Sequence, residues 1–387
     1  MTVIQRQTNA LEPTVIGPLL EELRKECQEH RFSVAPNPCV GAAIISGDRV
    51  VARGFHERWG SAHAEVNAMN AARAAGVDEA EWDAIIVTLE PCSSEGKTPP
   101  CLQAILDAGI PRVGIGAVDP DPRHSGAAVS LMEEAGLEVC VFQEPDTFEE
   151  ENAAFCGWVS PDRVRAARPW TIAKWAQTRT GQLSPPEDVG EGRWISGPES
   201  LAEVQVLRGE VDAILTGVGT LKSDDPRLSL RSPGTGEAPL RVVLDSYLRT
   251  PTDAALFRAP GTEESVGEVV ILTLAGADGP RWRALEESGA RVVGLRGDEE
   301  DRVSLVEVHL WLWEQGLRRV LLEAGPRLLE SHFERDLIDQ VRVYTGDVFG
   351  GEGVSLGHTL AGLSLAARLD RESGQDAVLE GFLLQED

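Results

Sequence analysis

Lysine is scarce in this chain of 387 residues, because the 36 basic residues are almost all arginine and face 63 acidic ones. The formal net charge of −27 argues against nucleic acid as a partner, since phosphate binding needs a basic surface. Such acidity is compatible with a salt-rich setting, where a charged surface stays hydrated and screened. It is equally compatible with GC-rich coding that replaces lysine by arginine. The lysines are Lys25, Lys97, Lys174 and Lys222.

Long apolar runs are also absent. No segment approaches the roughly 20 apolar residues needed to span a bilayer, and the N-terminal MTVIQRQTNALEPT lacks the hydrophobic region of a signal peptide. Six cysteines in a chain of this length do not suggest a disulfide scaffold. We therefore expect a cytoplasmic protein without membrane association, and the length predicts two domains.

Two short strings carry the strongest chemical signal: His63-Ala64-Glu65-Val66 and the segment from Pro91 to Cys101. His63, Cys92 and Cys101 are ligands that suit Zn²⁺, and three of them leave the fourth tetrahedral position for water. Glu65 lies two residues after the histidine, where it can move protons without binding the metal. A histidine, a nearby glutamate and a later Pro-Cys with a second cysteine form the signature of zinc deaminases of nucleobases.

Each half of this signature is weak alone. A His-x-Glu triplet is usually a helix face, and two loop cysteines can be unrelated thiols. Together and in order, with Pro91 before the first cysteine, they predict a zinc site. The scattered remaining cysteines are expected to be buried free thiols: Cys27, Cys39, Cys140 and Cys156.

Strand and helix signals alternate along the chain, which predicts mostly parallel sheets with covered faces. Residues 63–75 read as a helix that carries His63 and Glu65 in its first turn, and residues 99–108 as a helix after the cysteine loop. Residues 143–168 read as an interdomain connection, and a second α/β pattern begins at 170–176. The other expected strands are 39–46, 49–56, 83–90, 112–118, 137–142, 212–217, 240–245, 268–274, 318–325 and 340–346. The other expected helices are 17–30, 127–135, 198–208, 280–288, 303–315 and 326–334.

Read together, these strings resemble the bifunctional deaminase/reductases of riboflavin biosynthesis, and the likeness covers nearly the whole chain. In the first half it rests on PNPCVGAAI, GFHERWGSAHAEVNA, VTLEPCSSEGKTPPC and DPDPRHSGA. In the second half it rests on RPWTIAKWA, RWISGPES, AILTGVGTLKSDDPRL, RVVLDS and LLEAGP. The TPPC ending and the DPDP string distinguish this family from cytidine, tRNA-adenosine and guanine deaminases.

The resemblance implies an α/β fold with two domains. Residues 1–160 would form an N-terminal cytidine-deaminase-like α/β/α domain with its connecting segment, and residues 161–387 a C-terminal dihydrofolate-reductase-like α/β domain. The first would remove the ring 2-amino group of 2,5-diamino-6-ribosylamino-4(3H)-pyrimidinone 5′-phosphate with the help of Zn²⁺. The second would use NADPH to reduce the ribosyl group to ribityl. We expect a phosphorylated pyrimidine as the small-molecule substrate and a homo-oligomeric assembly.

The resemblance also implies roles for individual residues. His63, Cys92 and Cys101 match the zinc ligands, and Glu65 matches the proton shuttle. Positions that match substrate contacts are Asn37, His56, Lys97, Lys174, Arg208, Leu228, Arg231 and Glu323. Positions that match the nicotinamide cofactor are Ala176, Trp194, Thr220, Asp224, Ser246, Gly325, Pro326 and Arg327.

The residues alone leave several of these roles open. Asn37 reads equally as a turn former between two prolines, and His56 as a surface residue at a strand end. Lys174 is either a lysine that keeps an edge strand soluble or an ammonium near the ribose. Gly325-Pro326 opens an expected helix whose N-terminus can hold a pyrophosphate. There is no GxGxxG string, so a Rossmann fold is not predicted.

Three departures from the family pattern keep alternatives open. Ser94 stands where the family commonly has histidine, Gly192 where a serine usually contacts substrate, and Thr178-Arg179-Thr180-Gly181 where the family has Ser-Leu-Asp-Gly. One alternative is therefore an active deaminase with a weakened reductase-like domain. Another is a zinc-stabilised binding protein without catalysis, which would need a fourth protein ligand.

Overall fold

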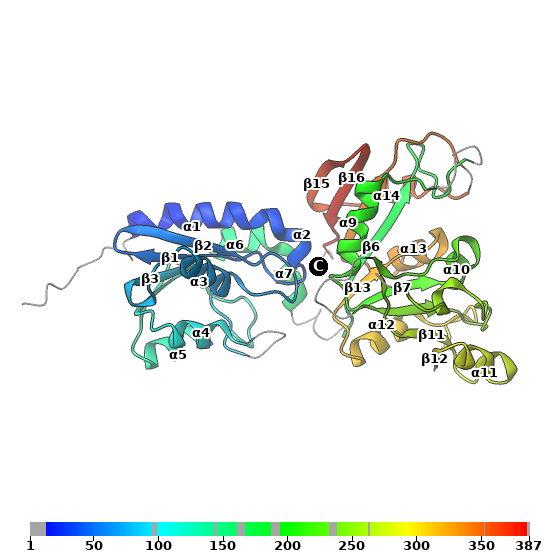
Figure 1. Ribbon diagram of the computed structural model, residues 1–387, viewed down its shortest axis with the longest axis horizontal. Helices are drawn as coiled ribbons and strands as arrows, with labels where there is room; N and C mark the ends of the chain where they lie inside the picture. Colours follow the sequence, from blue (N-terminus) through cyan, green and yellow to red (C-terminus); the bar gives the residue numbers. More distant parts are fainter. Residues whose placement is uncertain are drawn as a thin grey trace, which may run out of the picture. The chain divides into compact units, whose positions relative to one another are not determined.

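The chain divides into two compact units, residues 1–165 and 166–387. In Figure 1 the first runs from blue to cyan-green and the second from green to red. The computed structural model describes residues 13–94, 99–142, 145–160, 167–186, 194–231, 238–261, 264–351 and 353–384. Within these ranges, every helix is too short or too polar to cross a bilayer.

The first unit is built on a five-stranded sheet in the order β2-β1-β3-β4-β5. β1 pairs antiparallel with β2 and with β3, whereas β3, β4 and β5 run parallel. The expected hairpin between β1 and β2 is confirmed, and Gly47 takes a φ of 64° in its turn, which glycine adopts without strain. The strands are β1 Gly41–Ser46, β2 Arg49–Phe55, β3 Ala84–Leu89, β4 Arg112–Ala117 and β5 Glu138–Val141.

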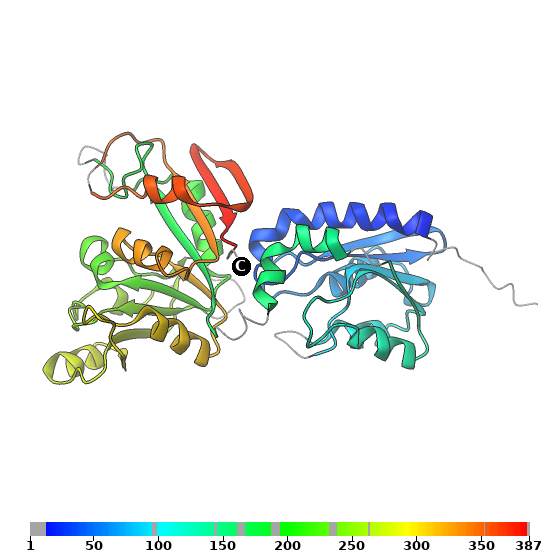
Figure 2. The same cartoon turned by 180° about the vertical axis from the view of Figure 1, so that it is seen from behind.

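Helices cover both faces of this sheet, as Figures 1 and 2 show from opposite sides. Alternate residues of each strand point to opposite faces. On one face the apolar side of α1 packs on Ala43, Ile45 and Ile86. On the other, α3, α4 and α5 enclose Ile44 and Ile85 in the main core. The helices are α1 Pro13–Cys27, η1 Gln28–His30, α2 Arg31–Val34, α3 Ala64–Ala74, η2 Glu79–Glu81, α4 Cys101–Asp107 and α5 Ala127–Glu134.

Two helices form where the sequence predicted an interdomain connection: α6 Pro145–Glu151 and α7 Ala153–Val159. Both belong to the first unit. Phe148 of α6 is buried in the main core, and Asn152 between the helices accepts a hydrogen bond at 2.7 Å from the backbone N–H of Cys39. The acidic sequence of α6 (PDTFEEE) offers few apolar residues, whereas α7 (AAFCGWV) is apolar but only 7 residues long, too short to show a clear helical period.

The second unit is built on a nine-stranded sheet in the order β12-β11-β9-β7-β13-β6-β14-β16-β15. Seven of these strands run parallel, and β16 and β15 add antiparallel at one end. A small pair, β8 with β10, lies outside it. The strands are β6 Trp170–Gln177, β7 Ala213–Gly217, β8 Leu230–Arg231, β9 Leu240–Leu244, β10 Glu264–Ser265, β11 Val269–Leu274, β12 Ala290–Leu295, β13 Arg319–Leu322, β14 Gln340–Thr345, β15 Ala366–Ser373 and β16 Asp376–Phe382.

The two faces of this sheet differ in character. One face joins α12 and α13 in the apolar core through residues such as Trp175 and Val343. The other carries Lys174 and Tyr344 toward α9. Because β6 lies between β13 and β14, Lys174 is on a central strand, and the edge-strand interpretation is wrong. The helices are α9 Pro198–Arg208, α10 Val218–Asp224, η3 Ala255–Phe257, α11 Pro280–Glu287, α12 Leu305–Glu314, α13 Pro326–Phe333 and α14 Gly357–Gly362.

Candidate active sites

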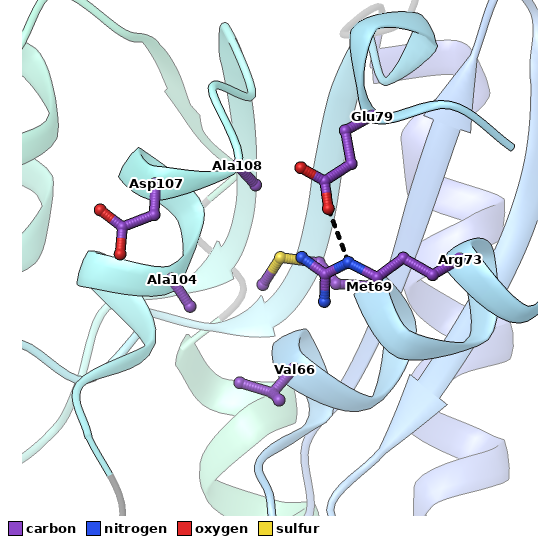
Figure 3. Close-up of a pocket in the computed structure, with 7 residues that line it drawn as sticks. All are labelled: Val66, Met69, Arg73, Glu79, Ala104, Asp107 and Ala108. Carbon is purple, nitrogen blue, oxygen red and sulfur yellow. Dashed lines mark hydrogen bonds and ion pairs between the residues drawn. The ribbon is translucent and has the colours of Figure 1, made fainter.

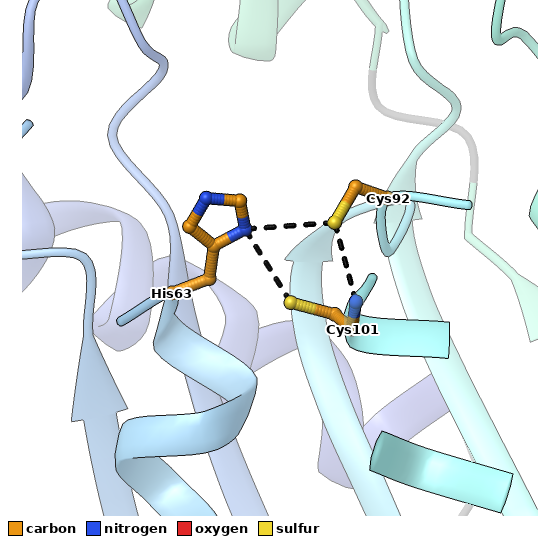
Figure 4. Close-up of side chains that lie close together, drawn as sticks. All are labelled: His63, Cys92 and Cys101. Carbon is orange, nitrogen blue, oxygen red and sulfur yellow. Dashed lines mark hydrogen bonds between the residues drawn. The ribbon is translucent and has the colours of Figure 1, made fainter. Parts of the chain in front are cut away.

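The structure brings the three expected metal ligands together (Figure 4). His63 Nδ1 lies 3.6 Å from Cys92 Sγ and 3.4 Å from Cys101 Sγ, and the three ligand atoms all lie within 4.8 Å of one another. Zinc bonds of about 2.0–2.3 Å in a tetrahedron place N and S ligands about 3.5 Å apart. The donor set and its spacing therefore fit Zn²⁺.

The protonation of the two thiols supports the same assignment. Cys92 Sγ faces the Cys101 thiol, His63 and the Cys101 backbone N–H, and these contacts lower the pKa of Cys92 to about 4. The facing thiolate and burial raise the pKa of Cys101. Without a metal, the surrounding protein groups therefore favour a thiolate at Cys92 and a protonated thiol at Cys101. A divalent cation would stabilise both thiolates, as metal ligation requires.

The start of α3 places His63 and Glu65. His63 is the N-cap of this helix, one position before the first turn in which it was expected. Gly54 on β2 lets the helix approach closely, because an added Cβ would lie 2.0 Å from Ala68 N and 2.5 Å from Ala64 O. The glycine therefore permits α3 to pack closely on β2 at its first turns, next to His63 and Glu65.

Glu65 is only 3% exposed, and burial raises the pKa of its carboxyl group. Interactions with His63 oppose this rise. A carboxyl group with a raised pKa, two residues after a metal ligand in the sequence, suits a general acid–base that takes up and returns a proton.

Asn37 and His56 extend the site on the histidine side. Asn37 Nδ2 lies 3.2 Å from His56 Nε2, and His56 Nδ1 lies 3.2 Å from the carbonyl oxygen of Ala62. If Nδ1 donates to this carbonyl, Nε2 accepts from the asparagine amide. The His56 ring packs edge-on against His63 at a centroid distance of 5.0 Å. His56 is 2% exposed, so the interpretation as a surface residue is wrong.

Two further sequence assignments fall outside the described ranges, namely Lys97 in the cysteine loop and Gly192 before α9. Ser94, which stands in the family's histidine position, lies in the described part of the loop and is exposed.

A half-buried charged cluster lies on the α9 face of the second unit. Arg208, the last residue of α9, makes a bidentate ion pair with Glu323 directly after β13, at 2.7 and 2.9 Å. Burial alone would raise the pKa of Glu323, but Arg208 and Lys174 lower it to about 2. Burial lowers the pKa of Lys174, which Glu323 opposes and Arg208 reinforces. Three of the predicted substrate residues thus form one electrostatic unit.

The expected cofactor positions include one direct link between neighbouring strand ends. The backbone N–H of Gly325 donates to Thr220 Oγ1 at 3.0 Å, which joins the start of α13 to the first turn of α10. Gly325 is the N-cap of α13 and Pro326 its first residue. Ser246 follows β9 at the same sheet edge, where its hydroxyl accepts a hydrogen bond from Val303 N at 3.0 Å. Ala176 packs beside Tyr344.

Within the described ranges, the remaining predicted site residues of this unit make no side-chain hydrogen bond or ion pair with the Lys174, Arg208 and Glu323 cluster. Leu228 is 4% exposed, and its backbone takes a left-handed conformation with a φ of 51°. The Arg231 side chain is exposed, and its backbone N–H donates to Gln205 Oε1. Three other positions are exposed to solvent: Trp194, Asp224 and Arg327.

The Thr178–Gly181 turn, where the family's acidic residue is missing, faces an acid that the sequence analysis missed. Arg179 makes an ion pair with Asp347 at 2.7 Å, and its backbone N–H donates to the carbonyl oxygen of Val348. Asp347 follows β14, the neighbour of β6, so parallel pairing brings the two segments together. An acid from another part of the chain therefore lies beside this turn, but a cation already pairs with it.

A separate hollow of about 230 Å³ lies between α3 and α4 (Figure 3). Its rim holds the Arg73–Glu79 ion pair at 2.6 Å. Its other lining residues are Val66, Met69, Ala104, Asp107 and Ala108. None of the seven is a metal ligand of the trio, so this hollow is distinct from the zinc site.

Comparison with known proteins agrees with these two sites. The family model described as "Cytidine and deoxycytidylate deaminase zinc-binding region" matches residues 18–117, and "RibD C-terminal domain" matches residues 169–370. The riboflavin biosynthesis protein RibD of Aquifex aeolicus is 34% identical over 322 residues, which are 83% of this chain and 84% of that protein. The Escherichia coli protein of the same name is 30% identical over 355 residues, with 89% and 90% covered.

Solved structures show the same architecture. Acinetobacter baumannii RibD (form 1) aligns with a TM-score of 0.66 at 26% identity, over 97% of this chain and 100% of that one. A Thermotoga maritima deaminase/reductase aligns with a TM-score of 0.64 at 27% identity, over 95% and 99%. The expected fold, a cytidine-deaminase-like domain followed by a reductase domain, is confirmed.

Proposed function

Because this chain belongs to the RibD family of riboflavin-biosynthesis deaminase/reductases, we propose roles in its two reactions for the residues of both sites. It catalyses zinc-dependent hydrolytic deamination of a phosphorylated pyrimidine and NADPH-dependent reduction of the product's ribosyl side chain. The observation that carries the proposal is the convergence of His63, Cys92 and Cys101 beside the buried Glu65.

In the deaminase unit, His63, Cys92 and Cys101 hold zinc, which when bound supplies a Lewis acid that activates water near neutral pH. Glu65 takes up a proton from the attacking water at its carboxylate and gives it to the pyrimidine ring, and it then takes up the water's second proton and gives it to the departing amino group, which leaves as ammonia. Asn37 and His56 orient the substrate, since their hydrogen bond and the contact with His63 fix both side chains next to the metal ligands. Lys97 pairs with the substrate phosphate.

In the reductase unit, Lys174, Glu323 and Arg208 hold the ribose and its phosphate, with Leu228 and Arg231 completing the substrate side. The Lys174 ammonium stabilises negative charge that develops on the carbonyl oxygen during reduction. Glu323 accepts hydrogen bonds from ribose hydroxyls. The low pKa of Glu323 supports this role, because it keeps the carboxylate an acceptor at all physiological pH values.

The NADPH positions lie mostly at the strand ends of the same unit. Thr220 and Gly325 place the N-terminus of α13 toward the pyrophosphate, where backbone N–H groups and the helix dipole favour negative charge. The further proposed contacts are Ala176, Trp194, Asp224, Ser246, Pro326 and Arg327. We also propose that the protein is cytoplasmic and homo-oligomeric, and that its domains end and begin near residues 160 and 161.

Metal analysis of cysteine variants tests the zinc assignment. Cys92→Ser and Cys101→Ser should each lose stoichiometric zinc and melt at a lower temperature, because two remaining ligands hold the metal poorly and metal binding contributes to folding. Cys140→Ser, on β5 and outside the trio, is the matched control and should keep its zinc. Full zinc content in both ligand variants would contradict the assignment.

Absorbance at the nicotinamide band tests whether the reductase is active. Supplied with the deaminated intermediate, the wild-type enzyme should oxidise NADPH steadily. Absence of oxidation, with ammonia release intact, would instead identify an active deaminase with a weakened reductase domain, the outcome suggested by the Thr178–Gly181 departure.

A further inference from the structure

Glu90, the residue between β3 and Pro91, anchors a second segment of chain beside the metal ligands. Its carboxylate is buried at 5% exposure and receives four backbone hydrogen bonds. Oε2 accepts from Asp119 N at 3.1 Å and from Gly126 N at 2.9 Å, and Oε1 accepts from Ala128 N at 2.8 Å and from Val129 N at 3.3 Å. Charge-assisted bonds of this kind are stronger than neutral ones, and the start of α5 favours the negative charge.

The two segments that meet at Glu90 leave neighbouring parallel strands. The metal-ligand segment, of which the structure describes residues 90–94 and 99–101, follows β3, and the adjacent loop, residues 118–126, follows β4. The backbone N–H of Glu90 also donates to the carbonyl oxygen of Ala117 at 2.9 Å. In open α/β sheets, ligands bind outside the carboxyl ends of the strands, so both segments border the region where substrate must enter.

The adjacent loop has its own internal order. Asp119 accepts a hydrogen bond from Asp121 N, and Asp121 makes a bidentate ion pair with Arg123, whose Nε donates to Oδ1 and whose Nη2 donates to Oδ2. The Arg123 guanidinium lowers the pKa of Asp121 and keeps this pair charged. These internal bonds give the loop a defined conformation. Glu90 binds the loop near both of its ends, at Asp119 and Gly126, and therefore fixes the position of the whole loop relative to Cys92.

We propose that Glu90 is a positioning residue for deamination: it sets the place of the adjacent loop relative to the metal-ligand segment and thereby the alignment of substrate with Glu65. This inference rests on the proposed deaminase function. A mutation far from the reacting atoms that misplaces the substrate by about 1 Å can lower the rate about 10²-fold. A loosened anchor therefore reduces turnover while the metal ligands, which Glu90 does not touch, remain in place.

Substitutions at Glu90 differ in what they remove. Glu90→Gln keeps the shape but loses the charge and directs an amide N–H₂ toward two backbone N–H donors, where no acceptor faces it. Glu90→Asp keeps the charge but is one methylene shorter, so it reaches fewer of the four donors. Asp83→Asn is the matched control, because the Asp83 carboxylate also accepts a backbone N–H, from Gly47 at 2.5 Å, at the β1–β2 hairpin before β3 begins.

Steady-state kinetics of deamination, normalised to bound zinc, test the proposal. Glu90→Gln should lower kcat about 10- to 100-fold and raise KM, with stoichiometric zinc and wild-type NADPH oxidation on the deaminated intermediate. Glu90→Asp should recover part of the kcat and provides the same comparison if the Gln variant folds poorly. Asp83→Asn should lower the melting temperature without changing either constant.

Wild-type kcat and KM per zinc in both Glu90 variants would overturn the inference, as would a loss of activity that follows zinc loss alone. Either result would leave the deaminase function intact, since the wild-type enzyme would still release ammonia. A wild-type enzyme that binds zinc and releases no ammonia would overturn the proposed function and this inference together.

Discussion

At the scale of single residues, both proposed sites contain carboxyl groups whose pKa is shifted by burial and by neighbouring charges. Glu65 is buried and its pKa is raised, whereas Glu323 is half-buried and its pKa falls to about 2 because Arg208 and Lys174 lie beside it. The first suits a group that exchanges protons, and the second suits a permanent acceptor. One side-chain chemistry thus supports two different functions.

Replacement of Lys174 tests the residue-scale account of the reductase. Lys174→Ala should lower NADPH oxidation about 10²–10³-fold, because the ammonium would no longer stabilise charge on the substrate oxygen. Zinc content and ammonia release should stay normal, since Lys174 belongs to the second unit. Lys25→Ala, an exposed lysine on α1, is the control. An unchanged oxidation rate in Lys174→Ala would place the reductase site elsewhere.

The ligand trio and Glu65 could be predicted from sequence because their spacing is local and their chemistry is specific. Asp347 and Glu90 could not be predicted in the same way. Asp347 reaches the Arg179 turn only through the pairing of β6 with β14, and Glu90 acts through backbone N–H groups that carry no sequence signal. Sequence motifs do not predict the role of a residue whose partners are brought together by strand pairing or are main-chain atoms.

At the scale of elements, the start of α3 decides the geometry of the zinc site, and its approach to β2 depends on Gly54. Sequence periodicity predicted this helix, β3 and β6 well, because their buried faces are continuous. It missed β15 and β16, which bear charges such as Arg371 and Glu380 that pair with each other at 3.1 Å. A strand whose polar groups are satisfied across the sheet does not show the expected apolar pattern.

An added methyl group at Gly54 should displace α3. We expect Gly54→Ala to reduce the free energy of unfolding by about 1–3 kcal/mol or more, because the new Cβ meets backbone atoms that cannot move independently. Deamination should fall at least about tenfold as His63 and Glu65 shift. Gly17→Ala on α1, where an added Cβ has no neighbour within 4 Å, should be neutral or slightly stabilising. Denaturant unfolding and ammonia release measure both effects, and normal stability in Gly54→Ala would refute the close approach.

His332 on α13 should make the stability of the second unit depend on pH. Burial lowers its pKa from 6.5 to about 4, so the unfolded chain binds a proton in this interval that the folded protein does not. Stability should therefore fall by up to about 3 kcal/mol as the pH drops from 6.5 to 4. His332→Asn should show a shallower fall, and the exposed-site variant His358→Asn should match the wild type. An unaltered slope in His332→Asn, from unfolding curves at several pH values, would contradict this role.

At the scale of the whole molecule, the residues that we propose for each reaction lie within one unit. The zinc ligands and Glu65 all lie in residues 1–165, and Lys174, Arg208 and Glu323 all lie in residues 166–387. The composition alone could not predict this division of labour. The order of the motifs predicted it, because each string belongs to one half of the chain.

One comparison tests the central claim most directly: zinc content, ammonia release and NADPH oxidation of Glu65→Gln beside the wild type. The amide keeps the shape of the carboxylate and loses its basicity, so deamination should fall about 10²–10⁴-fold while zinc stays stoichiometric. NADPH oxidation with the deaminated intermediate should equal the wild-type rate, because the second site lies in the other unit. Deamination by Glu65→Gln at the wild-type rate would contradict the assignment of the proton shuttle, and joint loss of both activities would contradict two independent sites.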